Sequence, residues 1–232
     1  EKIRGDRNME QMYSLNYMLK LIKSFCDNKS SDYMFIKHYN TLSLPENEVE
    51  KIVGETEEYC FLYYKFSKHQ MLEPYQPFLG WIRKLYYEYF ANETPDEFVK
   101  NAKVYPMQQY SVAEYIRTGK AWRIEDILIN ELPYESKRML DSLVSMYQYI
   151  CSKIKVFVVI ESLHLCNLSG IKALQKLMAV NRPGKFRLAA TYNESYNVPG
   201  YILNEWNAFI SEMEKQGYQY EWGAVDATVI GD

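Results

Sequence analysis

The sequence predicts an α/β protein with a doubly wound, mostly parallel five-stranded sheet that is flanked by helices and carries a helical insertion. Two apolar runs, residues 154–160 and 186–191, have the β-branched composition of strands buried on both faces of a parallel sheet. A helical stretch, residues 168–180, separates them, and strands that alternate with helices are typical of parallel sheets. No Pro- or Gly-rich linker interrupts the 232 residues, so we expect a single domain over residues 1–232.

The N-terminal part shows the same alternation. Apolar residues spaced three or four apart predict an amphipathic helix over residues 8–25. A short apolar strand at 33–36 follows, and Pro45 suits the first turn of a helix that runs toward Tyr59. A strand at 60–66 completes the expected β–α–β unit.

The rest of the chain is predicted to be mainly helical. Residues 93–136 are broken by prolines into short helical pieces, and we expect them to form an insertion over the edge of the site. Further helices and one edge strand are expected over residues 78–90, 135–151, 200–215 and 218–222.

Composition narrows the class of protein. Apolar residues make up 47% of the chain and charged residues 25%, as in ordinary globular proteins, and the net charge is −3. This charge does not favour a direct nucleic-acid-binding surface, and the longest apolar run is too short to span a bilayer. The four cysteines show no zinc-site spacing, so we expect no metal and a cytoplasmic protein with reduced thiols.

The strand at 154–160 leads directly to one carboxylate, Glu161. In nucleotide-hydrolysing folds, a carboxylate at this place helps to hold Mg²⁺ beside the phosphates. The other interpretation is a strand-end carboxylate that caps a neighbouring helix. Nearby His164 has a similar alternative, a partly buried histidine that is hydrogen-bonded to a loop.

Four segments resemble motifs of the STAND class of signalling ATPases in the AAA+ superfamily of P-loop NTPases. These segments are Arg4 to Glu10, Glu73 to Phe78, Glu161 to Asn167 and Leu188 to Asn193. The first resembles a Gly-Arg pair before a Glu-led helix, the second a Pro-Tyr-x-Pro-Phe turn, the third a Walker B segment and the fourth a sensor strand. The resemblance implies a P-loop NTPase-like fold, in a domain that forms the N-terminal part of a longer signalling protein.

The phosphate-binding loop of that family is missing. The corresponding segment, residues 38–47, has no Gly and no Lys, so neither the close backbone approach nor the charge that phosphates need is available. Glu46 at the start of the next helix would repel an anion. Ser162 replaces the carboxylate that would activate the attacking water, and a hydroxyl is a poor base near pH 7.

We therefore expect a vestigial nucleotide site without catalytic residues. Its candidate members are Arg7, Tyr39, Ser43, Glu161, Ser162 and Asn193. The preferred hypothesis is an inactive ATPase-like module that regulates or binds other domains of its polypeptide, or a protein partner, with no cofactor.

The alternative is a switch that binds ATP or ADP with Mg²⁺ weakly, without efficient hydrolysis. It would use Arg4 or Arg7, Glu161 and a basic cluster in the insertion. The members of that cluster are Lys100, Lys103, Arg117, Lys120 and Arg123. A solvated surface is the simpler explanation for these side chains.

Overall fold

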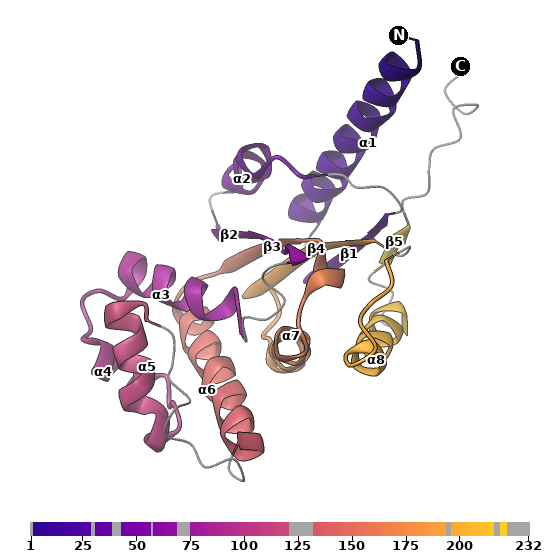
Figure 1. Cartoon of the computed structure of the whole chain (residues 1–232). Helices are drawn as coiled ribbons and strands as arrows, with labels where there is room; N and C mark the ends of the chain where they lie inside the picture. The colour runs from indigo at the N-terminus through magenta and orange to yellow at the C-terminus, as the bar shows by residue number, and fades with distance from the viewer. Residues whose placement is uncertain are drawn as a thin grey trace. The chain divides into compact units, whose positions relative to one another are not determined.

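The structure of the chain is a computed structural model (Figure 1). It describes residues 2–28, 31–38, 43–56, 58–68, 75–120, 132–193, 196–215 and 219–221. Within these ranges, only the backbone is described for residues 2–14, 132–135 and 219–221.

The chain divides into two compact units. The first comprises residues 1–69, 155–166 and 186–232, and the second comprises residues 70–154 and 167–185. The first unit contains α1 (Lys2–Asp27), β1 (Tyr33–His38), α2 (Glu46–Gly54), β2 (Cys60–Lys65), β3 (Val156–Glu161), η3 (Leu163–Leu165), β4 (Phe186–Asn193), α8 (Leu203–Lys215) and β5 (Gln219–Glu221). The second contains α3 (Phe78–Tyr89), α4 (Pro95–Asn101), α5 (Pro106–Thr118), α6 (Leu132–Lys153) and α7 (Leu168–Val180).

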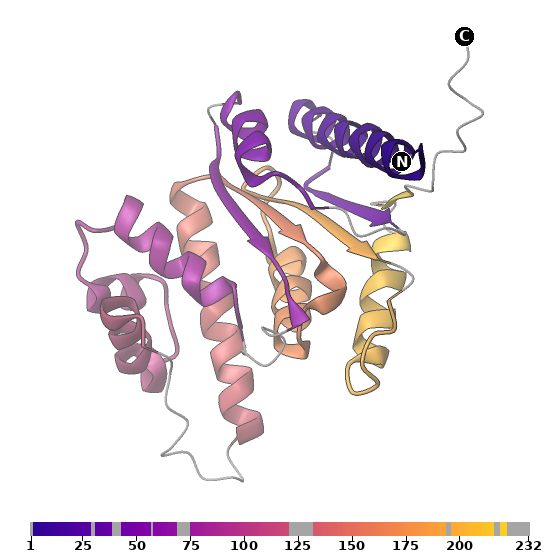
Figure 2. The same cartoon turned by 45° about the horizontal axis from the view of Figure 1, so that its top comes forward.

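The sheet of the first unit is parallel throughout, with the strand order β2-β3-β4-β1-β5. Figure 2 shows its strands running in the same direction. The predicted α/β class with a parallel sheet flanked by helices is confirmed. The sheet has four full-length strands rather than five, because β5 adds only three residues beside β1. The two strands of the expected β–α–β unit, β1 and β2, are not neighbours in the sheet, because β3 and β4 lie between them.

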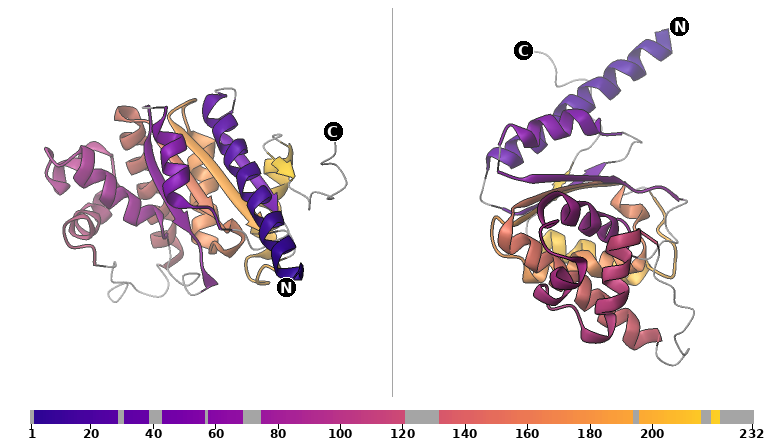
Figure 3. Two further views of the ribbon diagram at one scale, coloured as in Figure 1. Left: turned by 90° about the horizontal axis from the view of Figure 1, so that it is seen from above. Right: turned by 90° about the vertical axis from the view of Figure 1, so that its left-hand side faces the viewer.

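Both faces of the sheet are covered, which explains the apolar composition of its central strands. Helices α1 and α2 lie on one face and α8 lies on the other (Figures 1 and 3). Along β1 the side chains alternate: Met34 and Ile36 join the core under α1 and α2, while Phe35 faces Phe209 of α8 with ring centroids 5.6 Å apart. Every residue of β1 is buried.

The first two helices differ from the expected ranges. Helix α1 begins at Lys2 rather than near residue 8, so the segment with Gly5 and Arg7 is helical instead of preceding the helix. Helix α2 ends at Gly54, short of Tyr59, and Pro45 is its N-cap residue. A Pro at this position needs no amide hydrogen, because the first N–H groups of a helix have no partner within the helix.

The other elements follow the prediction closely. The range of α7 coincides with the expected helix at 168–180, and β4 extends the expected strand by two residues to Asn193. Strand β3 includes Glu161 as its last residue. Among the helices that the structure describes, none is both long and apolar enough to cross a membrane.

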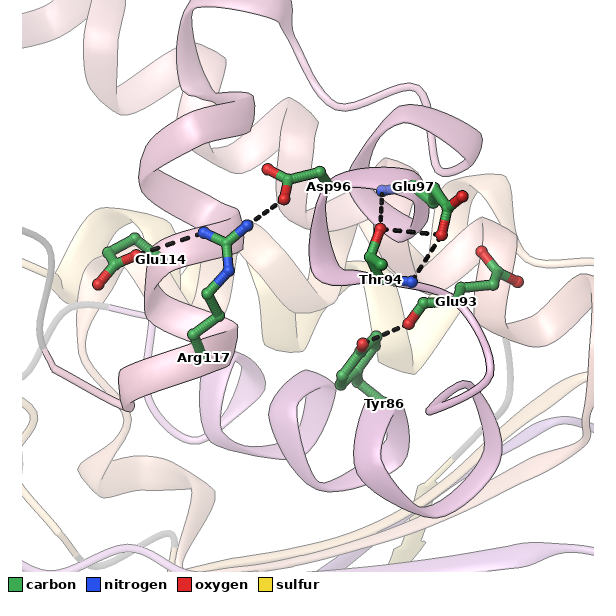
Figure 4. A network of polar contacts seen from close by, with 7 residues as sticks. All are labelled: Tyr86, Glu93, Thr94, Asp96, Glu97, Glu114 and Arg117. Atoms are coloured by element: carbon green, nitrogen blue, oxygen red, sulfur yellow. Dashed lines mark hydrogen bonds and ion pairs between the residues drawn. The ribbon is translucent and has the colours of Figure 1, made fainter.

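The second unit consists of helices. Its pairs α3 with α6, α4 with α5, and α6 with α7 are in contact. The hydroxyl of buried Tyr147 in α6 donates to the carbonyl of Phe78 in α3 at 3.1 Å. Helix α4 begins with a reciprocal cap, in which the Thr94 hydroxyl accepts from the Glu97 amide and the Glu97 carboxylate accepts from the Thr94 amide (Figure 4). The described part of the expected insertion is thus built into this helical unit.

A buried arginine fastens α1 to the sheet. Arg187 of β4 is 1% exposed, and its guanidinium donates to four carbonyl groups at the end of α1 and just beyond it. The acceptors and distances are Phe25 at 2.6 Å, Cys26 at 3.2 Å, Asn28 at 2.8 Å and Ser31 at 3.0 Å. The guanidinium carbon also lies 4.2 Å from the ring centroid of Phe25. This cation meets the negative end of the α1 dipole, where positive charge is stabilising.

Replacing Arg187 with Lys should destabilise the protein strongly. Lysine keeps the charge but cannot reach several carbonyl groups with a planar fork, so the free energy of unfolding should fall by about 3 kcal/mol. Urea denaturation followed by circular dichroism measures this change. The matched control is Arg182→Lys on the exposed surface, which should change stability by less than about 0.5 kcal/mol. Equal midpoints for the two variants would contradict the role of Arg187.

Candidate functional site

The strands of the sheet all deliver their last residues to one edge. His38 and Asn193, which end β1 and β4, are register partners, and so are Lys65 and Glu161, which end β2 and β3. Polar side chains from distant parts of the sequence therefore come together at this edge. In open parallel sheets this is where ligands bind, and it is the candidate site of this protein.

Glu161 is the most buried charged group at this edge, with 1% of its surface exposed. Its Oε2 accepts hydrogen bonds from the backbone N–H of Leu44 at 3.0 Å and from the hydroxyl of Tyr63 at 2.6 Å. Its Oε1 forms an ion pair with Lys65 Nζ at 2.8 Å and no hydrogen bond to any other residue in the described ranges. Two neutral donors and one cation thus compensate a charge that burial would otherwise make costly.

The same contacts hold the segment that leads into α2. Lys65 Nζ donates to Ser43 Oγ at 2.7 Å, so one ammonium group bridges Ser43 and Glu161. The side chain of Leu44 is buried in the core with residues of α1 and α2, while its amide faces Glu161. The Glu161 carboxylate therefore lies just before the start of α2, where a negative charge is favourable. The second interpretation of Glu161 is a strand-end carboxylate that caps a neighbouring helix. The hydrogen bond to Glu161 comes from the Leu44 amide, one residue before the N-cap Pro45, so the carboxylate lies beside α2 without binding an amide of its first turn in the described contacts.

The environment of Tyr63 keeps its hydroxyl protonated. Burial, followed by the hydrogen bond to Glu161 and the charge of that carboxylate, raises the pKa of Tyr63 well above its usual range. The phenol is therefore protonated at neutral pH and available as a hydrogen-bond donor. It acts as a fixed donor to Glu161 and has no tendency to serve as a base.

His164 is a second buried polar group at the same edge. Its Nδ1 accepts a hydrogen bond from the backbone N–H of Asn193 at 3.0 Å, and its ring centroid is 4.8 Å from that of Tyr196. Burial, helped by nearby His38, lowers the pKa of His164 from 6.5 to about 4. The ring is therefore neutral at pH 7, and because Nδ1 is an acceptor, the proton is on Nε2. The alternative of a partly buried histidine hydrogen-bonded to a loop is correct in part: His164 is hydrogen-bonded, but it is buried and its partner is the last residue of β4.

Ser162 has an unusual backbone conformation. Its φ of 61° and ψ of 44° place it in the left-handed region, which costs a residue with a side chain roughly 1 kcal/mol. Its N–H donates to the hydroxyl of Thr191 at 3.3 Å, which supports the sharp turn from β3 into η3. The turn brings His164 back toward the end of β4, where it meets Asn193.

The structure brings some of the predicted site residues together and leaves others untested. Ser43 and Glu161 are joined through Lys65, and Asn193 is joined to the turn that follows Ser162 through His164. Tyr39 lies outside the described residues. The backbone of Arg7 is helical, but its side chain is not among those described.

The basic cluster of the expected insertion is partly neutralised. Arg117 forms ion pairs with Asp96 and with Glu114, the second at 3.3 Å (Figure 4). These contacts are exposed and contribute little stability, but they leave the guanidinium with two carboxylate neighbours. Arg123 lies outside the described residues. The described part of the cluster therefore favours a solvated surface over a phosphate site.

Two members of the site were not identified from the sequence, Tyr63 and Lys65. They alternate with buried Leu62 and with Tyr64 along β2, and the period of two places them on one face of the strand. That periodicity was visible in the sequence. The pairing of Lys65 with Glu161 was not, because it depends on how β2 aligns with β3.

Comparisons with known proteins give no family for this chain. No protein-family model matches it, and no curated protein is significantly similar in sequence. Within the described ranges, no three His, Cys, Asp or Glu side chains gather as a metal-binding group. The chemistry of the site must therefore be argued from its geometry.

Removing the Tyr63 hydroxyl should destabilise the protein measurably. In Tyr63→Phe, Glu161 loses a donor at 2.6 Å, and a hydrogen bond to a buried charge contributes about 2 kcal/mol. Urea unfolding measures the loss, with Tyr110→Phe as the matched control because Tyr110 is 74% exposed. If Tyr63→Phe unfolds at the same urea concentration as the control variant, the hydrogen bond has no structural importance.

His164 should make stability depend on pH. In the folded protein its pKa is about 4, whereas in the unfolded chain it is near 6.5, so only the unfolded state takes up a proton between these values. The contribution of His164 to the free energy of unfolding should therefore be complete above pH 6.5 and should decrease as the pH falls toward 4. His164→Asn removes this titration and keeps an acceptor for the Asn193 amide. Its melting temperature should fall less steeply with decreasing pH than that of the wild type, and parallel curves would contradict the assignment.

Proposed function

We propose that this chain is an ATPase-like domain, resembling the STAND class of the AAA+ superfamily, that no longer hydrolyses nucleotide. It serves as a regulatory or protein-interaction module within a longer, cytoplasmic signalling protein. The parallel sheet with flanking helices is compatible with a P-loop-like fold. The protein partner would be another domain of the same polypeptide or a separate chain.

The contact between Glu161 and Leu44 carries the proposal. In the family that the sequence resembles, the loop after the first strand binds phosphate and the carboxylate that ends the third strand serves the metal. Here these two parts bind each other, since the Leu44 amide donates to Glu161 Oε2. Tyr63 and Lys65 occupy the rest of the carboxylate. A ligand would have to break these contacts before it could use either part.

The position after Glu161 supports the same conclusion. Ser162 stands where the family has a second carboxylate, and its backbone N–H is already bonded to Thr191. His164 is neutral at pH 7, but its Nδ1 is engaged by the Asn193 amide, so that nitrogen cannot act as a base. Neither Ser162 nor Nδ1 of His164 therefore supplies a general base at this edge.

A nucleotide-binding switch without efficient hydrolysis is the second candidate. The observation that favours it is the pair of Ser43 and Lys65, both exposed and joined at 2.7 Å beside the segment that leads into α2. A hydroxyl and an ammonium group can both donate hydrogen bonds to a phosphate. The ion pair of Lys65 with Glu161 opposes this use, because the carboxylate already neutralises the ammonium.

Calorimetric titration with ATP, ADP and GTP in the presence of Mg²⁺ distinguishes the two candidates. The module hypothesis predicts no binding tighter than about 100 μM, which corresponds to roughly −5.5 kcal/mol, and no phosphate release. Lys65→Met is the control if the titration gives a weak heat of binding. Binding through the candidate site would be lost in this variant, whereas nonspecific binding would persist. Tighter binding that depends on Lys65 would replace the module with the switch.

A further inference from the structure

Donors from two parts of the first unit converge on the carboxylate of Glu161. The Leu44 N–H comes from the segment before α2, and the Tyr63 hydroxyl and the Lys65 ammonium come from β2. All lie within 3.0 Å of a carboxylate oxygen. The carboxylate itself belongs to the neighbouring strand, β3, in which Glu161 is the register partner of Lys65.

This set of donors has the composition of an anion-binding site. It combines a backbone amide near a helix N-terminus, a hydroxyl that stays protonated and an ammonium group, which are the groups that proteins use for carboxylates and phosphates. The accepting carboxylate is buried, since Glu161 is only 1% exposed, and a buried acceptor strengthens these contacts although the Lys65 side chain itself is exposed. Among the described residues, Oε1 has the ion pair with Lys65 at 2.8 Å and no hydrogen bond.

We infer that Leu44, Tyr63 and Lys65 form an oxyanion site, and that Glu161 occupies it as an internal ligand. The tethered carboxylate keeps the site filled and excludes external anions from the segment before α2. A free carboxylate or phosphate takes its place when the Glu161 carboxylate is removed. The inference goes beyond the proposed function because it requires only this geometry and no relation to ATPases.

Chemical rescue of a truncated side chain tests the inference directly. Glu161→Ala removes the last methylene and the carboxylate, which together match one acetate ion. The variant should melt at a lower temperature than the wild type, and acetate should raise that temperature saturably. At ten times its dissociation constant, acetate should give a shift of about 3–5 °C relative to chloride at equal ionic strength.

Two control proteins show whether the effect is specific. The wild type should give no saturable shift, because its own carboxylate fills the site. Glu55→Ala removes a carboxylate from an exposed ion pair with Lys23 and should likewise not respond. A response of Glu161→Ala that is no larger than those of the controls would overturn the inference.

A refolding measurement covers the case in which Glu161→Ala is unfolded in chloride. Acetate or inorganic phosphate should then restore the far-ultraviolet circular dichroism of the wild type saturably, because an anion that binds only the folded state shifts the equilibrium toward it. Chloride at equal ionic strength should not restore the signal, and an equal lack of recovery in acetate and phosphate would overturn the inference.

These outcomes are independent of the nucleotide titrations. Rescue by acetate can succeed while the wild type binds ATP tightly, in which case the oxyanion site stands and the module hypothesis fails. Rescue can also fail while ATP does not bind, and then only the oxyanion site is lost. Comparing acetate with phosphate further shows which kind of oxyanion the site prefers.

Discussion

A charge that is buried in a sheet has to be met by polar groups close to it, and this requirement shapes the first unit of the protein. Two such charges lie at opposite ends of the central strands. Arg187, near the start of β4, is met by carbonyl groups at the end of α1, and Glu161, at the end of β3, is met by the amide before α2. Each pairing matches the sign of the helix dipole, a cation at a C-terminus and an anion at an N-terminus.

The two charges also connect the helices to the same core. Helices α1 and α2 pack on one face of the sheet, where Met34, Ile36 and Leu44 are buried together. Apolar packing by itself would tolerate small shifts of a helix along the sheet. The directional bonds of Arg187 and Glu161 restrict such shifts, since each requires a particular helix end at a particular strand residue. Packing and hydrogen bonding therefore specify the same arrangement.

This arrangement also limits what the edge of the sheet can do. A carboxylate that faced solvent could hold a metal or activate water, but Glu161 is already occupied by Tyr63, Lys65 and the Leu44 amide. His164 is held neutral and directed at Asn193 in a comparable way. The contacts described for Glu161 and His164 at this edge are therefore contacts within the protein, and they stabilise the fold.

Much of the fold could be predicted from the sequence, because it depends on local patterns. The apolar run before Glu161 and the helical spacing of residues 168–180 identified β3 and α7, whose residues are adjacent in the chain. The sequence also showed that the segment before α2 has neither the Gly nor the Lys of a phosphate-binding loop. It determined the α/β class and the chemical types available at the edge of the sheet.

The partners of those residues were decided by the tertiary structure alone. Lys65 and Glu161 are far apart in the sequence, and only the register of β2 on β3 places them side by side. Arg187 looked like an isolated charge in an apolar strand until α1 supplied its acceptors. Such contacts join distant segments, and the local sequence of one segment does not indicate which other segment it will contact. The sequence therefore determined which groups are buried, whereas the packing of distant segments decided how their charges are met.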